Sequence, residues 1–200
     1  MVERMDRNTK AKGTSGKRAK AQDVRVSKKN PYEIVYEVMT VEGVKIAQEI
    51  LHEEGRLLAA KIQLNILQQL LPFTPLNPQY AAWKRREGLD PRILIANGDY
   101  VDSIKARKKV DGSIEVSVPE GKHPQAGISY QILGAVHEYG QVRWQQEGKG
   151  IPARPHWRPS VQWWYRKRLD QTVTKMETDI EEAILERLEK QVGNRKYTRT

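Results

Sequence analysis

The chain has 200 residues, a formal net charge of +10, a hydrophobic fraction of 38% and no cysteine. The absence of cysteine excludes disulfides and thiolate zinc sites, and no run approaches the roughly 18 consecutive apolar residues of a membrane-spanning helix. The length suits one domain with appendages, and the mean hydropathy of -0.73 indicates that part of the chain lies outside the core.

The positive charge is concentrated at the two ends of the sequence. Residues 1–30 and 191–200 are strongly basic, whereas acidic and basic residues balance between 31 and 190. Residues 1–30 show no helical or strand periodicity, so we predict a flexible basic arm that is disordered in isolation. It is either a solvated tail or a contact for DNA or a neighbouring subunit, and the candidate residues are Lys10, Lys12, Lys17, Arg18, Lys20, Lys28 and Lys29.

Residues 31–192 are predicted to form a single domain, followed by a basic tail at 193–200. Alternation over residues 32–38 indicates a short strand or the approach to a helix. Thr40 is then expected to cap a long helix that ends near Leu71, before two prolines. Gly55 lies inside this helix and is expected to let another helix approach closely. The predicted apolar stripe comprises Val44, Ala47, Leu51, Leu58, Ile62, Ile66 and Leu70.

A long proline-rich connection, residues 72–92, comes next, with a possible helical turn at 80–86. Connections of this length are usually functional or bound by partners. A short helix is predicted to start at Asn97 or Asp99. Asp111-Gly112 between the alternating segments 104–110 and 114–118 then predicts a β-hairpin.

The last third is predicted to contain two helices separated by irregular chain. The first spans 129–139 and ends at Gly140; residues 141–150 form an exposed loop and 151–159 an extended, proline-stiffened segment. The final helix begins near Pro159 or Ser160 and ends near Gln191. Its predicted apolar face comprises Val161, Tyr165, Leu169, Val173, Met176, Ile180, Ile184 and Leu188. The predicted fold class is α+β, with two long amphipathic helices packed on a small antiparallel sheet.

Sequence motifs for catalysis are scarce. There is no glycine-rich phosphate loop and no GxSxG nucleophile elbow, and the histidines lack metal-binding spacing. His137-Glu138 is the nearest approach to a metal motif, and we expect His137 to make a structural hydrogen bond instead. We therefore predict a protein that is not an enzyme and that uses no cofactor.

Tryptophan and arginine gather near the start of the final helix. Such a cluster can stack on single-stranded nucleic acid, form a protein interface, or begin the core face of the helix. We favour the interface and core interpretations. The candidate interface residues are Trp83, Trp157, Arg158, Trp163 and Trp164.

Two short motifs carry a family resemblance. Tyr130 precedes His137-Glu138-Tyr139-Gly140, and Pro152-Ala153-Arg154-Pro155 follows after a loop. Together they resemble a signature of the tail-completion, neck (head–tail connector), virion-morphogenesis and minor tail proteins of long-tailed bacteriophages. The resemblance covers roughly residues 40–190, and His156 stands where this family usually has phenylalanine.

The resemblance implies a structural virion protein at the neck or top of the tail. It implies a homo-oligomeric ring, most plausibly a hexamer, in contact with neck, connector or tail-tube proteins and with DNA in the channel. Its location would be the virion, after assembly in the host cytoplasm, with no membrane contact. A pairing of Arg154 with Glu138, or with a neighbour's carboxylate, fits the motif chemistry. The alternatives are a nucleic-acid-binding protein that uses the basic ends and the Trp/Arg cluster, and a metal-dependent enzyme built on His137 and Glu138.

Overall fold

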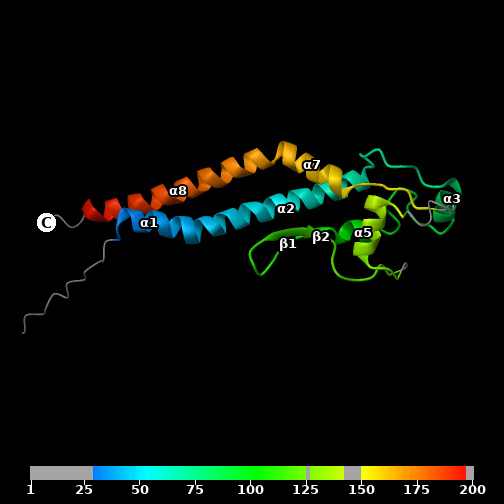
Figure 1. Ribbon diagram of the computed structural model, residues 1–200, viewed down its shortest axis with the longest axis horizontal. Helices are drawn as coiled ribbons and strands as arrows, with labels where there is room; N and C mark the ends of the chain where they lie inside the picture. Colours follow the sequence, from blue (N-terminus) through cyan, green and yellow to red (C-terminus); the bar gives the residue numbers. More distant parts are fainter. Residues whose placement is uncertain (1–28, 125–126, 142–149, 197–200) are drawn as a thin grey trace, which may run out of the picture.

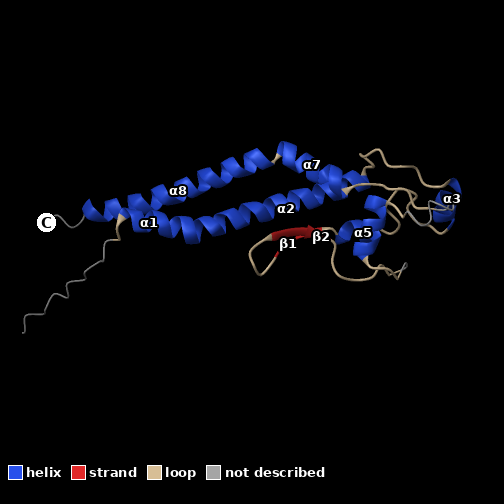
Figure 2. Ribbon diagram, viewed as in Figure 1, coloured by secondary structure: helices blue, strands red, loops and turns tan. Residues whose placement is uncertain are grey.

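The computed structural model describes residues 29–124, 127–141 and 150–196, with side chains described up to residue 192. Two helical segments lie side by side and form a rod, and a loop-rich head occupies one end (Figure 1). A two-stranded hairpin lies along one side of the rod (Figure 2). The chain is mostly helical with a small antiparallel sheet, so the predicted α+β class is confirmed.

The first helical segment begins ten residues before the predicted cap. It comprises α1 (Pro31–Glu37), the π-helix η1 (Val38–Glu42) and α2 (Gly43–Leu67). Asn30 caps α1, since its side chain accepts a hydrogen bond from the amide of Tyr32 and its backbone amide donates to the Glu33 carboxylate. The prediction of Thr40 as the cap is therefore wrong, and so is the strand alternative for 32–38.

The apolar stripe predicted for this segment faces the core only in its second half. Ile62 and Ile66 are fully buried, whereas Val44 and Leu51 are exposed. In the first half the buried side chains are Ile34, Val38 and Ile50. The stripe departs from prediction because α8 packs along α1, η1 and the start of α2, where Gly43 faces Ile180, and a different set of side chains points to it (Figure 1).

The hairpin is the predicted one, with shorter strands. β1 (Lys105–Lys108) pairs antiparallel with β2 (Ile114–Ser117), and Gly112 in the turn has a φ of 82°. The hairpin packs on α2 at Gly55, where an added Cβ would lie 2.8 Å from the Ile114 side chain. The expectation that a second helix approaches this glycine is therefore wrong.

The head is built from three short helices and their connections. They are α3 (Pro78–Arg86), α4 (Asp99–Ser103) and α5 (Tyr130–Tyr139). α4 begins at Asp99, one of the two predicted starts, with Gly98 (φ 95°) as the residue before it, while Ser129 and Gly140 bound α5 as predicted. The buried core of the head and the adjoining half of α2 comprises Ala59, Ile62, Ile66, Ile95, Tyr100, Val101, Ile104 and Val118.

The second helical segment contains a break that the sequence analysis did not predict. α7 (Trp157–Lys167) and α8 (Leu169–Lys196) meet at Arg168, whose φ is -121°. The Arg168 guanidinium is held by the buried carboxylate of Glu54 on α2, with N–O distances of 3.1 and 2.5 Å. α8 then runs back along α2, η1 and α1. On the predicted apolar face of this segment, Tyr165 and Val173 are exposed.

Candidate functional site

The two halves of the family signature meet in the head. Residues 151–156 return alongside α5 before α7 begins (Figure 1). The amide of Arg154 donates to the carbonyl of His137 at 2.6 Å, and the amide of Gln141 donates to the carbonyl of Ile151 at 3.0 Å. The HEYG and PARP motifs are therefore neighbours in space, although a loop separates them in sequence.

Glu138 is the residue that joins them. Its carboxylate is buried and accepts from the backbone amides of His156, Trp157 and Arg158 at 2.8–3.0 Å. These amides belong to the first turn of α7, which has no other side-chain cap. Glu138 thus caps a helix from eighteen residues earlier in the chain, and its negative charge lies at the favourable end of the helix dipole.

Arg154 binds elsewhere than predicted. It is buried, its Nε donates to the carbonyl of Thr74 at 2.8 Å, and a terminal nitrogen donates to the carbonyl of Pro75 at 3.2 Å. The expected Arg154–Glu138 pair is therefore wrong, because Glu138 is occupied by the amides of α7. Arg154 instead fastens the proline-rich connection, residues 72–92, to the head.

A buried polar chain lies beside the cap. The indole of Trp157 donates to the Tyr100 hydroxyl at 3.2 Å, and this hydroxyl lies 2.6 Å from Nε2 of His156. Nδ1 of His156 lies 3.1 Å from the carbonyl of Arg154, so it must carry the proton. Burial lowers the pKa of His156 and raises the pKa of Tyr100 to about 12. Both groups are therefore neutral, and Tyr100 donates to His156.

The structural hydrogen bond that we expected of His137 is not made by its Nδ1. This atom is buried and has no partner among the described residues. Burial is the main cause that lowers the pKa of His137 to about 3, and the neighbouring His156, Arg154 and Lys84 act in the same direction because each disfavours a second positive charge beside it. The imidazole is therefore neutral near pH 7.

The remaining motif residues form the outer part of the junction. Tyr130 is half-buried with its ring 5.8 Å from that of His123, and Tyr139 is exposed beneath the guanidinium of Arg158. Gly140 has a φ of 78°, a conformation that favours glycine. Pro152 and Pro155 are half-buried and Ala153 is exposed.

The candidate interface tryptophans differ in their surroundings: some contact other parts of the chain, and one is exposed. The Trp164 indole donates to Glu54 on α2 at 3.0 Å, and Trp163 has the Lys61 ammonium 5.4 Å above its ring. Together with Trp157, these side chains make contacts within the chain, as in the core interpretation. Trp83 is different, because it is 39% exposed and stacks on Tyr80 at 5.4 Å.

Most of the candidate arm residues lie outside the described part of the chain. Lys29 is the exception, and it pairs with Glu37 of α1. The residues outside the described ranges are Lys10, Lys12, Lys17, Arg18, Lys20 and Lys28.

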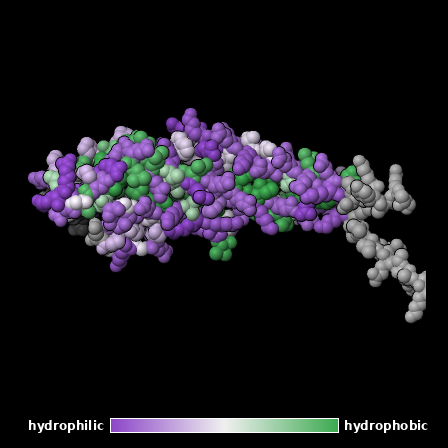
Figure 3. All heavy atoms as spheres, turned by 180° about the vertical axis from the view of Figure 1, so that it is seen from behind, coloured by the Kyte–Doolittle hydropathy of each residue, from purple (hydrophilic) through white to green (hydrophobic). Residues whose placement is uncertain are grey.

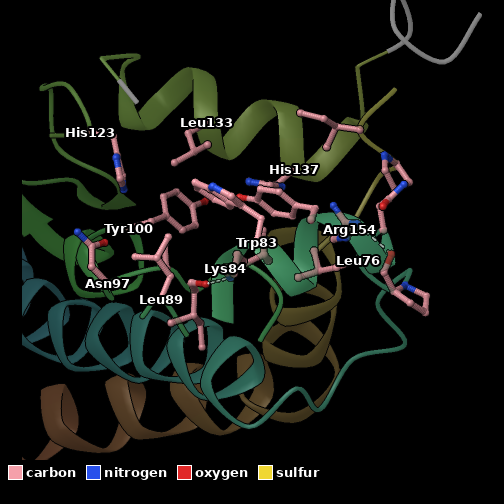
Figure 4. Close-up of a pocket in the computed structure, with 18 of the residues that line it drawn as sticks. Leu76, Trp83, Lys84, Leu89, Asn97, Tyr100, His123, Leu133, His137 and Arg154 are labelled. Atoms are coloured by element: carbon pink, nitrogen blue, oxygen red, sulfur yellow. Dashed lines mark hydrogen bonds between the residues drawn. The ribbon is translucent and has the colours of Figure 1, made fainter. Parts of the chain in front are cut away.

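A cavity of about 870 Å³ adjoins the junction. Its wall is formed by the start of the proline-rich connection, α3, the loop before α4, α5 and residues 150–154. Figure 4 shows Trp83, Lys84, Tyr100, His137 and Arg154 arranged around it. No aspartate or glutamate lies among the described residues that line it.

Two residues of this region were not predicted as site residues. Lys84 stands in no motif, so nothing in the sequence distinguishes it, and Tyr100 lies in the segment 97–104, which matches a further step of the resembled family only loosely. His156 did carry a signal, because it departs from the family's usual phenylalanine. The structure explains the departure: His156 is fully buried and hydrogen-bonded on both ring nitrogens.

Metal and membrane features are not found in the described part of the chain. There, no group of three or more His, Cys, Asp or Glu side chains is placed to hold a metal ion. None of the described helices has both the length and the apolar character needed to cross a bilayer.

Comparison with known proteins gives one distant similarity. The chain is 26% identical over 119 residues to "Uncharacterized protein MJ0331" of Methanocaldococcus jannaschii, a match covering 57% of this chain and 78% of that protein. No family model matches the chain, and no solved structure matches it.

Proposed function

We propose that the chain is a structural subunit of the neck or tail-completion region of a long-tailed bacteriophage, and that it assembles into a homo-oligomeric ring. The observation that carries the proposal is the Glu138 cap. The two motifs that suggested the family act as one structural unit, in which the carboxylate of the first organises the helix that follows the second.

The exposed surface supports an assembling protein. Tyr32 and Tyr36 are 83% and 72% exposed, and Met39 and Val44 are also exposed along the same end of the rod. Hydrophobic patches recur along the molecule between hydrophilic residues (Figure 3). Apolar side chains gathered in this way gain free energy when a partner covers them.

The shape supports the same proposal. We take the paired helical segments, α1 to α2 and α7 to α8, as a rigid body that sets the spacing of subunits. A closed ring needs contacts between two different faces of each subunit. The apolar end of the rod and the head, with its proline-rich connection, are two such faces.

The test is imaging of the purified full-length protein together with analysis of particles. We expect negative-stain electron microscopy to show closed rings, six-fold by our proposal, and mass spectrometry to find the chain in purified virions. A protein that stays monomeric at high concentration and is absent from virions would overturn the assignment.

A nucleic-acid titration distinguishes the alternative function. If the chain were primarily a nucleic-acid-binding protein, deletion of residues 1–28 would abolish tight binding that falls steeply with salt. We expect this deletion to leave ring formation intact.

A further inference from the structure

We propose that the cavity beside His137 binds a small organic anion, with a carboxylate- or sulfonate-type head group on an aromatic or aliphatic body. Part of the cavity wall belongs to the proline-rich connection invoked for ring assembly, but ligand binding is not among the arguments for that assembly. A failure of probe binding would therefore leave the proposed structural function untouched, and a failure of ring formation would leave the probe measurements valid.

The wall of the cavity contains two buried cationic side chains. Lys84 is 3% exposed, and its ammonium donates to the carbonyls of Arg92 and Ile95. An ammonium has three donors, so one N–H of Lys84 remains without a partner among the described residues. Arg154 is 5% exposed and donates from its side chain to two backbone carbonyls.

Neither cation has a carboxylate in direct contact within the described part of the chain, although Asp90 lies near enough to Lys84 to act on it electrostatically. Lys84 and Arg154 form no ion pair there, and no acidic side chain described by the structure lines the cavity. A buried charge without a counter-ion is costly, because carbonyl dipoles replace only part of its hydration. An anion entering the cavity would relieve this cost.

The uncharged part of the cavity wall is mostly apolar, so it favours a ligand whose remaining atoms are apolar. Leu76, Leu89 and Leu133 supply aliphatic surface, and Trp83 and Tyr100 supply aromatic rings (Figure 4). The volume of about 870 Å³ lies within the range of small-molecule sites. His137 adds a neutral imidazole whose buried Nδ1 has no partner among the described residues. An apolar body with one anionic group therefore matches the wall better than a free inorganic ion.

The proposal is tested with two fluorescent probes of nearly identical shape. 1-Anilinonaphthalene-8-sulfonate carries an anion on an aromatic body, and N-phenyl-1-naphthylamine is the same body without the sulfonate. We expect the sulfonate to bind full-length protein at one site per chain, about tenfold or more tightly than the neutral probe, because it makes charge-assisted hydrogen bonds.

Three variants locate the bound probe. Lys84→Met should lower the affinity for the sulfonate about tenfold while changing that for the neutral probe little. Arg85→Met, which removes an exposed cation from the same helix, is the matched control and should change neither. Ala96→Trp places a large ring in the cavity wall and should abolish binding of both probes, with circular dichroism verifying that the fold is kept.

Two results would overturn the proposal. Equal affinity for the charged and neutral probes in the unaltered protein would show that the cavity does not recognise an anion. Undiminished sulfonate binding to folded Ala96→Trp would show that the probe sits elsewhere. Neither result depends on the stability of the Lys84 variant.

Discussion

At the scale of single residues, Glu138 caps the N-terminus of α7, a role that no sequence rule assigned to it. Sequence rules for helix caps consider the residues immediately before a helix. The cap of α7 is instead Glu138 on α5, which lies eighteen positions before His156, the first residue whose amide donates to it. The motif was visible in the sequence, but its partner was not, because tertiary contact alone brings the amides of α7 to this carboxylate.

We expect Glu138→Gln to destabilise the fold by roughly 1–3 kcal/mol. The amide keeps one acceptor oxygen but loses the charge and offers an N–H to the α7 amides, which leaves buried donors without partners. Urea unfolding followed by circular dichroism measures the change. Glu120→Gln, at an exposed position, is the control and should fall within about 0.5 kcal/mol of the unaltered protein.

The buried histidines predict a loss of stability in mild acid. The pKa of His137 falls from an ordinary 6.5 to about 3 in the folded state, so the unfolded chain binds the proton first as the pH drops. The contribution of His137 is complete above about pH 6.5 and declines toward pH 3, with a limiting slope of about 1.4 kcal/mol per pH unit. His156, whose pKa is also lowered by burial, acts in the same direction.

Urea unfolding at pH 7 and pH 5 checks this expectation. The free energy of unfolding should fall by about 2 kcal/mol from His137 alone over that interval. His137→Phe should remove that share of the pH dependence. An unchanged difference between pH 7 and pH 5 in this variant would contradict a buried neutral His137.

At the scale of elements, sequence was most informative where local chemistry decides the conformation. Asp111-Gly112 located the hairpin and Gly140 the end of α5, because each demands a backbone conformation that few other residues adopt. The early start of α1 was also readable, since Asn30, Pro31 and Glu33 form a capping-box pattern that the analysis passed over.

The break at Arg168 was not readable from the sequence. The periodicity of residues 160–191 fits a single helix, and no proline or glycine interrupts it. The break coincides with a tertiary pair, in which the buried Glu54 of α2 binds Arg168 and the Trp164 indole. Such a contact lies more than a hundred residues away along the chain, beyond any local pattern.

Gly55 gives a prediction at this scale. Its missing side chain lets β1 and β2 approach α2, and a Cβ at this position would lie 2.8 Å from Ile114 and 3.2 Å from Ala106, which is closer than ordinary van der Waals contact. Gly55→Leu should therefore cost roughly 2–4 kcal/mol through overpacking. Ala60→Leu, on the exposed side of α2, is the matched control, and thermal unfolding compares the two. Equal melting temperatures would contradict the packing.

At the scale of the whole molecule, the rod carries more apolar surface than its own chain covers. The predicted stripe of the long helix is an apolar face, and the structure covers only part of it. Ile62 and Ile66 are buried near the head, whereas Val44 and Leu51, farther along the rod, are exposed. A periodic pattern identifies an apolar face, but it does not reveal whether the partner of that face belongs to the same chain.

Self-association should depend on the exposed apolar side chains of the rod. Tyr36→Glu is expected to weaken oligomer formation at least tenfold, because it places a charge among exposed Tyr32, Met39 and Val44. The monomer should keep its stability within about 0.5 kcal/mol. Thr174→Glu adds the same charge at an exposed polar position of α8 and is the control. Sedimentation velocity would contradict this expectation if both variants associated alike.

The π-helical turn at Val38–Glu42 has a consequence for how this protein can vary in length. A π-turn accommodates one more residue than an α-helical turn, so removing a single residue here would restore regular winding. α1 would then keep nearly the same orientation around the rod, and Ile34 would stay buried. The same deletion within the regular winding of α2 would instead turn everything before it by about 100°. This short stretch is therefore the place in the rod where the chain can lose a residue without exchanging its buried side chains for its exposed ones.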